Sequence, residues 1–524
     1  MNAETFLVEQ NKALHNLYKD LLLKGWMTTT TGEEVWNSKL QEAQSKLDSY
    51  YADSKRFEEV KYLLQSNKVN SIEKRELKDL YNNMFKNQLT EEERIKSSIL
   101  KKQLVHLFNT FRPKIDERLV TNNDIRNILS HSQDEMERKK AWIASKQIGK
   151  KVQSVLIELV KQRNKEAELL GFKNFYEMSY QTQELDVQSI FELFQRLIKL
   201  SDEPYRRIKE EIDEEISTEL GCKTKDIQPW HYTDPFFQGA PPIKGFNPNV
   251  FYKEKKLEEL ADATFESLGL NIKDILNRSD LYPRKDKYPY GYCTNMGRDA
   301  KPRVLLNIDS TDFWMSAILH EFGHAVYDKY INKNLSFILR RPSHTLTTEG
   351  VAMFFGRMNR FPNWLHRFLG IKDPSIQTLT PIILKLSKRD MLVSMRWYLT
   401  FVFFEKELYE NPDQDLNKKW WELVEKIQFI RPPGVTDYPD WASKMHFSLA
   451  PVSYQNYILG ELMASQIKNY IETNVSKDLF NPLVGEYLIK NCFHDGAQFN
   501  WNHLIQRMTG ELLTPDFFVE EFIR

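Results

Sequence analysis

The chain has 524 residues, of which 41% are hydrophobic and 28% charged, as is typical of a globular protein with a large buried core. Its 73 basic and 73 acidic side chains balance, which argues against nucleic acid or a charged membrane surface as the main partner. No apolar stretch reaches the ~18 residues of a membrane span, and the first residues lack a signal-peptide pattern. The cysteines Cys222, Cys293 and Cys492 lie far apart and indicate reduced thiols, so we expect a cytoplasmic protein.

From the N-terminus to Leu220, most of the chain is predicted to form amphipathic helices. Apolar residues recur at intervals of three and four, with Lys and Glu between them, in the stretches 57–65, 77–85, 99–111 and 151–162. A stretch rich in Pro, Gly and aromatic residues follows at 228–249, "QPWHYTDPFFQGAPPIKGFNPN". It predicts a long irregular loop, which we interpret as a packed connector rather than a hinge.

Two short strands are predicted downstream, at "YGYCTNM" (290–296) and "RVLLNI" (303–308), with a turn between them. Ser310 or Thr311 can cap the next helix, which is expected to run to about Ile331. Beyond it the pattern is nearly continuous helix, interrupted at "RRPSH", "NPDQD", "IRPPGVTDYPD" and "LAPVS". The sequence therefore predicts a mainly α protein with a small sheet just before one central helix.

That central helix contains the stretch "SAILHEFGHAVYDKY" (316–330). His320 and His324 lie one helical turn apart on one face, a spacing that lets two imidazole nitrogens reach a single ion. Glu321 lies roughly 100° round the helix, where it can take a proton from an attacking water. The alternative is a pair of structural histidines in the core. We favour zinc, because a buried trio of polar groups without a partner is costly and a chance match occurs in roughly one such chain in a hundred.

A third metal ligand is expected on a following element, because catalytic zinc usually has three protein ligands. Glu349 lies downstream of His324, early in the next predicted helix, within "HTLTTEGVAMFFGRM" (344–358). A glutamate among such apolar residues is costly unless it is paired or bound to a metal. The alternative for Glu349 is stabilisation at a helix N-terminus, and His344 is a less favoured ligand candidate. The sequence thus predicts a Zn²⁺ site formed by His320, His324 and Glu349.

With these residues the chain resembles gluzincin zinc peptidases, and more specifically the angiotensin-converting-enzyme family. Three segments follow in that family's order: "ATFESLGL", "CTNMGRDAKPRVLLNIDSTDFWMSAILHEFGH" and "WWELVEKIQFIRPPGVTDYPDWASKMHFSLAPVSYQNYI". The last segment also resembles thimet-type oligopeptidases and Taq-type carboxypeptidases. The resemblance implies one large helical peptidase domain, with a deep central cleft between two lobes and a small antiparallel sheet beside the zinc helix. Residues 1–240 would form a mostly helical lid and residues 241–524 the zinc-binding catalytic lobe.

The resemblance also implies roles for residues of the last segment. His446 and Tyr457 would donate hydrogen bonds to the substrate carbonyl and the developing oxyanion. Lys444 and Tyr454 would hold the C-terminal carboxylate of the substrate. The ordinary alternatives are core aromatic residues three apart on a helix for the tyrosines, and a surface charge for the lysine.

The chain departs from the family's pattern at several positions. Asn456 stands where animal members have the arginine of a chloride site, so we do not expect chloride activation. Met353 replaces an aspartate that orients a zinc histidine, and another group must take its place. A second substrate-binding histidine is missing, and Thr294 is the nearest residue. The spacing between His446 and Tyr457 is one residue longer than in the animal enzymes.

The expected function is zinc-dependent hydrolysis of peptide bonds in short peptides, most simply as a dipeptidyl carboxypeptidase. One alternative is an oligopeptidase that cuts internally. Another, of a different class, is a zinc-stabilised peptide-binding or receptor protein with little catalysis. The expected partners are short peptides, without nucleic acid or membrane, and a monomer is favoured.

Overall fold

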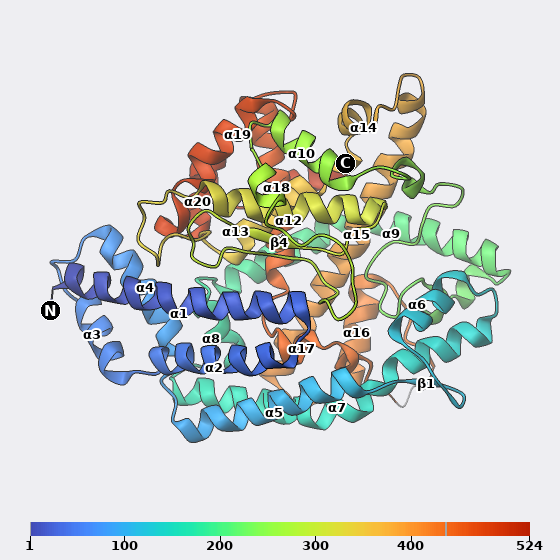
Figure 1. Cartoon of the computed structure of the whole chain (residues 1–524). Coiled ribbons are helices and arrows are strands. Elements are labelled where there is room, and N and C mark those ends of the chain that lie inside the picture. The colour runs from blue at the N-terminus through green and yellow to red at the C-terminus, as the bar shows by residue number, and fades with distance from the viewer. Residues whose placement is uncertain (1, 435–437) are drawn as a thin grey trace. The chain divides into compact units, whose positions relative to one another are not determined.

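A computed structural model describes residues 2–434 and 438–524 of the chain (Figure 1). These residues are mainly helical and include two antiparallel pairs of short strands, which confirms the predicted fold class. The break expected at "IRPPGVTDYPD" (residues 430–440) lies partly outside the described residues. None of the helices in the described ranges is both long and apolar enough to cross a lipid bilayer. All three cysteines are described, and none forms a disulfide bond.

The chain divides into two compact units, each assembled from three separate stretches. The first unit comprises Met1–Gln88, Asn247–Ile383 and Leu459–Phe518, and the second comprises Leu89–Phe246, Leu384–Ile458 and Val519–Arg524. Three helices continue through a boundary between these stretches: α15 (Ser375–Glu410), α18 (Gln455–Asn474) and α21 (Asp516–Phe522). The expected lid and catalytic lobe, divided at residue 240, stay a prediction, and so does the cleft between them.

The first unit contains the sheet β3–β4 and the helices around it. Its elements are α1 (Ala3–Thr31), α2 (Glu34–Tyr51), α3 (Ser54–Leu64), α4 (Ser71–Phe85), α10 (Leu257–Ser267), α11 (Lys273–Leu276), β3 (Tyr292–Thr294), β4 (Arg303–Leu305), α12 (Asp312–Tyr330), α13 (Thr345–Gly356), α14 (Pro362–Leu369), α19 (Pro482–Leu488) and α20 (Trp501–Thr509).

The N-terminal helices of the first unit share an apolar core with residues 337–339 and Ala497. Leu77, Leu80 and Met84 recur at intervals of three and four along α4 and are almost completely buried. The start of α4 is stabilised by a capping box, in which Asn70 and Glu73 each accept a backbone N–H of the other residue. The periodic pattern that predicted these helices therefore marks their buried faces.

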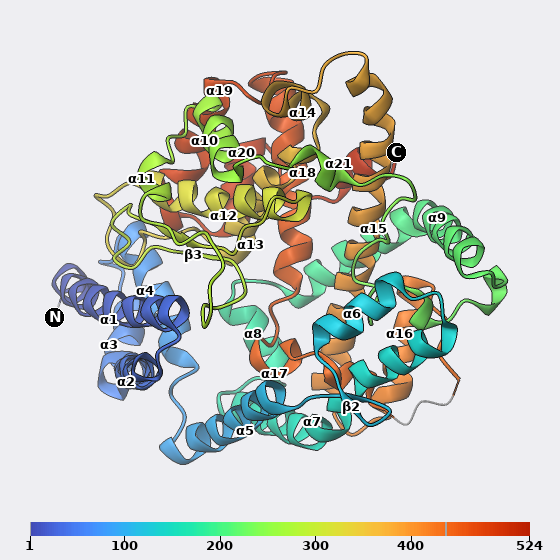
Figure 2. The ribbon, with the colours of Figure 1, turned by 45° about the vertical axis from the view of Figure 1, so that its right-hand side comes forward.

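The sheet and the central helix of the first unit lie next to each other, as Figure 2 shows. β3 and β4 are antiparallel, with Cys293 opposite Val304, and they lie within the two predicted strand segments. α12 begins one residue after Thr311, whose hydroxyl accepts the N–H of Trp314 at 3.3 Å. Both the predicted sheet beside this helix and the predicted cap are confirmed.

Long helices dominate the second unit. Its elements are α5 (Glu91–Thr110), β1 (Lys114–Ile115), β2 (Arg118–Leu119), α6 (Asn122–His131), α7 (Glu135–Leu169), α8 (Phe175–Thr182), α9 (Val187–Leu220), α16 (Leu416–Gln428) and α17 (His446–Leu449). α5 and α7 run side by side in Figures 1 and 2.

The predicted irregular loop is present in the second unit. Residues 228–246 form one 3-10 turn and no α-helix or strand. The aromatic side chains of Trp230, Tyr232 and Phe237 are buried, and Arg138 of α7 donates to the carbonyl groups of residues 230–232. These contacts are those of a packed connector.

Candidate functional site

The His-Glu-x-x-His stretch lies in the middle of α12, and α13 packs directly against it. Gly323 lies at this contact, where a Cβ atom would approach the Cα of Ala352 to 2.9 Å, closer than side chains normally come. On the other side of α13, a Cβ at Gly460 of α18 would lie 3.1 Å from the Cβ of Glu349. Glycine at these two positions therefore lets three helices approach closely around Glu349.

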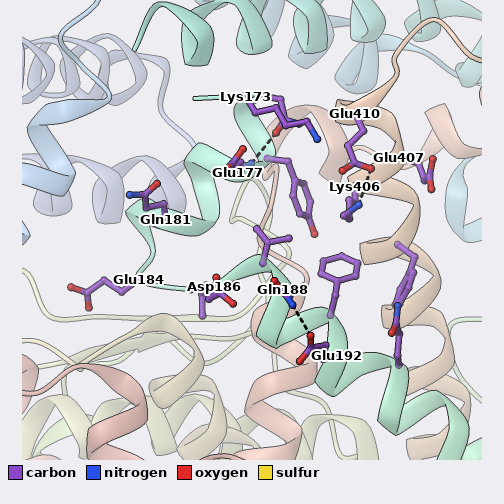
Figure 3. Close-up of a pocket in the computed structure, with 17 residues that line it drawn as sticks. Lys173, Glu177, Gln181, Glu184, Asp186, Gln188, Glu192, Lys406, Glu407 and Glu410 are labelled. Atoms are coloured by element: carbon purple, nitrogen blue, oxygen red, sulfur yellow. Dashed lines mark hydrogen bonds and ion pairs between the residues drawn. The ribbon is translucent and has the colours of Figure 1, made fainter. Parts of the chain in front are cut away.

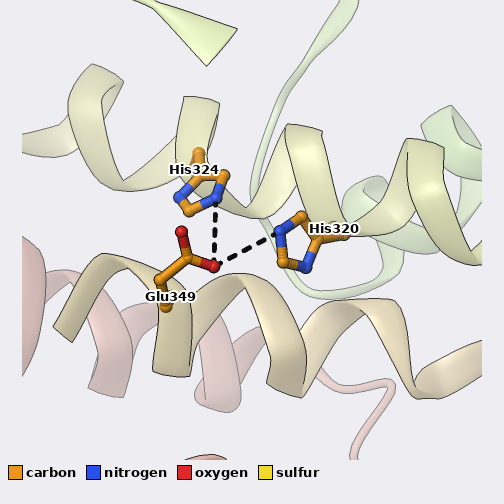
Figure 4. Close-up of side chains that lie close together, drawn as sticks. All are labelled: His320, His324 and Glu349. Carbon is orange, nitrogen blue, oxygen red and sulfur yellow. Dashed lines mark ion pairs between the residues drawn. The ribbon is translucent and has the colours of Figure 1, made fainter. Parts of the chain in front are cut away.

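The side chains of His320, His324 and Glu349 converge between α12 and α13 (Figure 4). The Oε2 atom of Glu349 lies 3.6 Å from Nε2 of His320 and 3.9 Å from Nε2 of His324. The two imidazole rings are perpendicular, with their centroids 4.9 Å apart. Ligands bound tetrahedrally at 2.0–2.1 Å lie roughly 3.3–3.5 Å from one another, so the two distances to Glu349 are slightly longer than those around a bound zinc ion.

The electrostatics of this group suit a cation. Burial lowers the pKa of His320 to about 4 and the pKa of His324 well below its usual value, so both imidazoles are neutral and offer a lone pair. Burial, together with the charge of Glu461, raises the pKa of Glu349 to about 7. Oε2 of Glu349 is buried and accepts no hydrogen bond from the described residues. Neutral nitrogen donors and an unsatisfied carboxylate oxygen form the donor set that zinc prefers.

Glu321 lies beside this group on α12 and is partly buried. Burial and the charge of Glu349 raise its pKa to about 8. The residue before β3 approaches it: a Cβ at Gly291 would lie 3.6 Å from Cγ of Glu321 and 2.6 Å from Cδ2 of Leu306. Thr294, the predicted substrate-binding residue, is buried at the end of β3 and pairs with Arg303.

A hydroxyl group that was not predicted from the sequence orients one of the histidines. Oγ1 of Thr348 lies 2.7 Å from Nδ1 of His324, which leaves Nε2 of that ring directed toward Glu349. Thr348 directly precedes Glu349 on α13, so its position next to a ligand was the available signal. The competing ligand candidate, His344, caps α13 instead, since its Nδ1 accepts the N–H of Leu346 at 3.0 Å.

The other predicted site residues belong to the second unit, in the segment that includes α17 and the start of α18. The ring of His446 is perpendicular to the ring of Tyr454 at 5.1 Å, and Tyr454 stacks on Phe401 at 3.8 Å. Burial and the charge of Lys444 lower the pKa of His446 to about 4. Tyr457 is 36% exposed, whereas Tyr454 is 5% exposed. Tyr454 is therefore also a core aromatic residue, and Tyr457 presents more of its side chain to solvent.

Lys444 is enclosed rather than placed at the surface. Its Nζ donates to Oε1 of Gln238 at 2.6 Å and lies about 5 Å from the ring centroids of Phe236 and Trp397. Burial lowers the pKa of Lys444 to about 8, although the charge of Asp234 opposes this shift. Gln238 was not predicted as a partner of Lys444, because it lies in the irregular loop, far from Lys444 in the sequence.

A large cavity lies elsewhere in the second unit, between α8, α9 and α15 (Figure 3). It has a volume of about 1110 Å³ and is lined by six carboxylates and only two lysines. Lys406 is paired with Glu410 across 2.7 Å, and Gln188 donates to Glu192. None of the predicted site residues lines this cavity.

Comparison with known proteins supports the chemistry of the His-His-Glu group. The model of Peptidase family M3 matches residues 128–239, from within α6 to beyond α9. The chain is a zinc metallopeptidase. The matched part of the peptidase comprises 112 of its 524 residues and lies in the second unit, before the metal-binding helices in the sequence. No curated protein shows a significant match to it.

Proposed function

We propose that this peptidase, which acts on oligopeptides, removes dipeptides from the C-termini of short peptides. The observation that carries the proposal is Lys444, an enclosed ammonium group whose pKa is lowered to about 8. An enclosed cation is a natural partner for the free carboxylate of a peptide terminus. Tyr454 lies in the same aromatic cluster as Lys444, through Trp397, and would be the second group that holds the carboxylate.

The catalytic group in this proposal is Glu321, with His320, His324 and Glu349 as the zinc ligands. Zinc, when bound, supplies Lewis acidity that polarises the scissile carbonyl and lowers the pKa of the attacking water. Glu321 takes a proton from that water and delivers it to the leaving amine. Its raised pKa suits this role, because a carboxylate that has taken a proton must hold it until the C–N bond breaks.

The oxyanion donors in this proposal are His446 and Tyr457. A neutral imidazole has one N–H to donate, and the lowered pKa of His446 keeps its ring neutral at physiological pH. Nδ1 of His446 is buried without a hydrogen bond to the described residues. Such donors typically contribute about 3–4 kcal/mol each to stabilisation of the transition state.

The substrate would bind in extended form along β3. This strand pairs with β4 on one side, and Thr294 stands at its end. Backbone N–H and C=O groups of a sheet edge can pair with a peptide of any sequence, and the pockets beside the edge then select its side chains. This mode of binding fits an enzyme that accepts many short peptides.

The second candidate function is an oligopeptidase that cuts internally. The match of residues 128–239 to Peptidase family M3 favours it. A separate observation is that the segment that carries His446 resembles thimet-type oligopeptidases. The closer resemblance to angiotensin-converting enzymes favours the dipeptidyl carboxypeptidase. A peptide-binding protein with little catalysis is the candidate of another class, and it requires neither Glu321 nor the oxyanion donors.

Mass spectrometry of one peptide in two forms, with a free and with an amidated C-terminus, separates these candidates. The zinc-loaded wild type is incubated with each form, and Glu321→Gln serves as the blank. We expect dipeptides to be released from the free form only. Internal cuts in both forms would establish an oligopeptidase and would show that Lys444 and Tyr454 do not hold a C-terminal carboxylate. The absence of cleavage in both forms, with zinc bound, would favour the binding protein.

A further inference from the structure

The segment between His446 and Tyr457 adopts a conformation that needs external support. It consists of the single helical turn α17 followed by a turn in which Val452 has a φ angle of 51°. A β-branched residue is strongly disfavoured in this left-handed region, so such a conformation persists only where surrounding contacts impose it. Val452 is 1% exposed, so those contacts come from the interior of the second unit.

Arg163 of α7 holds the first half of this segment. Its guanidinium donates to the carbonyl oxygens of Phe447 at 3.2 Å and of Ser448 at 2.7 Å, and also to the hydroxyl of Tyr409 at 3.0 Å. Phe447 directly follows His446 in the chain. Arg163 is 7% exposed, and the planar shape of its guanidinium fixes the two carbonyl groups relative to each other.

Glu405 of α15 holds the second half. Its Oε1 accepts the N–H of Val452 at 2.9 Å, at the residue with the left-handed conformation. The side chain is fully buried, and its Oε2 has no hydrogen-bond partner among the described residues. A buried carboxyl group is costly, and this one has a single direct contact that compensates for its burial.

Gln183, just after α8, also supports this segment. Its Nε2 donates to the carbonyl of Val452 at 3.1 Å, and its Oε1 accepts from the side-chain amides of Gln455 and Asn456, each at 3.3 Å. Arg163 and Gln183 both lie within residues 128–239, the part that matches Peptidase family M3. The matched helices therefore make direct contact with the segment that carries the proposed oxyanion donors.

We propose that Arg163 and Glu405 are positioning residues, which hold the backbone from Phe447 to Val452 so that His446 and Tyr457 point correctly at the reacting carbonyl. This inference rests on the proposed function, because it assigns a purpose to the orientation of the two donors. The physical reason is that a displacement of about 1 Å at a catalytic donor can cost on the order of 100-fold in rate. Neither residue needs to touch the substrate.

The test compares a disruptive and a conservative variant at each position. Arg163→Met and Glu405→Leu remove the polar contacts with little change in volume, whereas Arg163→Lys and Glu405→Gln retain part of them. We expect kcat/KM to fall roughly 10–100-fold in the disruptive variants, mainly through kcat, with substantial rescue in the conservative variants. Arg207→Met and Glu203→Gln are the matched controls, because these two side chains form an exposed ion pair in the second unit and should leave kcat/KM unchanged.

A phosphinic peptide separates positioning from a loss of folded enzyme. Its tetrahedral phosphinate imitates the intermediate, so its Ki depends on the oxyanion donors, while titration with it counts the active molecules. For Arg163→Met and Glu405→Leu we expect Ki to rise by the factor by which kcat/KM falls, with the zinc content unchanged. In a protein that already carries His446→Gln, Arg163→Met should lower kcat/KM further by less than about threefold, because both changes act through the same donor.

Two results would overturn the inference in distinguishable ways. If the titrated molecules of both disruptive variants keep the wild-type kcat/KM and Ki while His446→Gln loses both, then Arg163 and Glu405 have only a structural role. If His446→Gln and Tyr457→Phe themselves keep the wild-type values, then the oxyanion donors of the proposed function are wrong, and the positioning role is lost with them.

Discussion

The two regions that carry the proposed chemistry are held in place by different means. His320 and His324 share a face of α12 because four residues make about one helical turn, and close helix packing adds Glu349 from α13. The segment from His446 to Tyr457 is interrupted between α17 and α18, where residues 450–454 belong to no helix or strand. It depends on hydrogen bonds from side chains that lie far earlier in the chain, such as Arg163. Metal ligands on a helix are therefore evident from spacing alone, whereas the supports of an irregular turn are not.

The two regions resemble each other in the protonation of their histidines. Burial lowers the pKa of His320 and of His446, in each case to about 4. Both rings are consequently neutral in the physiological range, but for different uses. A neutral ring offers a lone pair to a metal ion at one site, and a single N–H to an oxyanion at the other. A positive charge would abolish metal binding at the first site.

The largest effect is expected at the base beside the metal group. Glu321→Gln removes the proton acceptor while it keeps the shape of the side chain, so turnover should fall by at least about 1000-fold. The zinc content, measured by inductively coupled plasma mass spectrometry, should stay at the wild-type level. Glu259→Gln, an exposed change in the same unit, is the control and should have no effect. A Glu321→Gln enzyme with substantial turnover would exclude Glu321 as the base.

A smaller but still large effect is expected at the second region. Tyr457→Phe removes one hydroxyl group and keeps the ring, so kcat should fall on the order of 100-fold while KM changes little. Steady-state kinetics with a short quenched fluorescent peptide measures both constants. Tyr62→Phe, at a tyrosine that is 68% exposed, is the matched control. Loss of affinity at constant kcat would show that Tyr457 binds the substrate and does not stabilise the transition state.

Thr348 supports the metal group through its hydroxyl group, as Arg163 supports the segment from His446 to Tyr457 through its guanidinium group. Thr348→Val keeps the shape but removes the hydroxyl at Nδ1 of His324, so zinc affinity should fall roughly 10–100-fold. Thr348→Ser should restore most of it. Competition with a chromogenic chelator measures the affinity, and Thr345→Val, at the exposed start of α13, is the control. Equal affinity in Thr348→Val and the wild type would mean that packing alone orients His324.

The smallest effect concerns pH and Lys444. Because burial lowers its pKa to about 8, the side chain is charged below that pH and neutral above it. For a peptide with a free C-terminus, KM should therefore rise about tenfold between pH 7 and pH 9, whereas an amidated peptide should lack this rise. In Lys444→Met the difference between the two peptides should vanish. If KM depends on pH in the same way for both peptides in the wild type, then Lys444 does not bind the substrate carboxylate.

Much of the local structure could be predicted because it depends on neighbours in the chain. The helix expected from Thr311 to about Ile331 is α12, from Asp312 to Tyr330, and Thr311 caps it. The strands expected at 290–296 and 303–308 are β3 and β4, although each is only three residues long. Regular apolar periodicity, a capping hydroxyl and a turn between strands are all signals that lie within a few residues of one another.

The supporting groups could not be predicted, because each depends on contacts between distant parts of the chain. Thr348 was adjacent to a predicted ligand, yet only the packing of α13 on α12 brings its hydroxyl to His324. Glu405 gave no sign of its contact with Val452, since nothing in "FVFFEKELYE" distinguishes a buried carboxylate from an exposed one. Gln238 lies in a loop without periodicity, and its contact with Lys444 spans 206 residues.

The sequence by itself determined the helical class, the small sheet and the position of His320 and His324 on one face of a helix, because these features follow from periodicity and spacing along the chain. The tertiary structure alone decided how those residues are supported and protonated. Burial sets the pKa values of Glu321, His446 and Lys444, and burial is a property of everything packed around a side chain. The left-handed turn at Val452 follows the same logic: its own residues disfavour it, and Arg163, Gln183 and Glu405 impose it from distant parts of the chain.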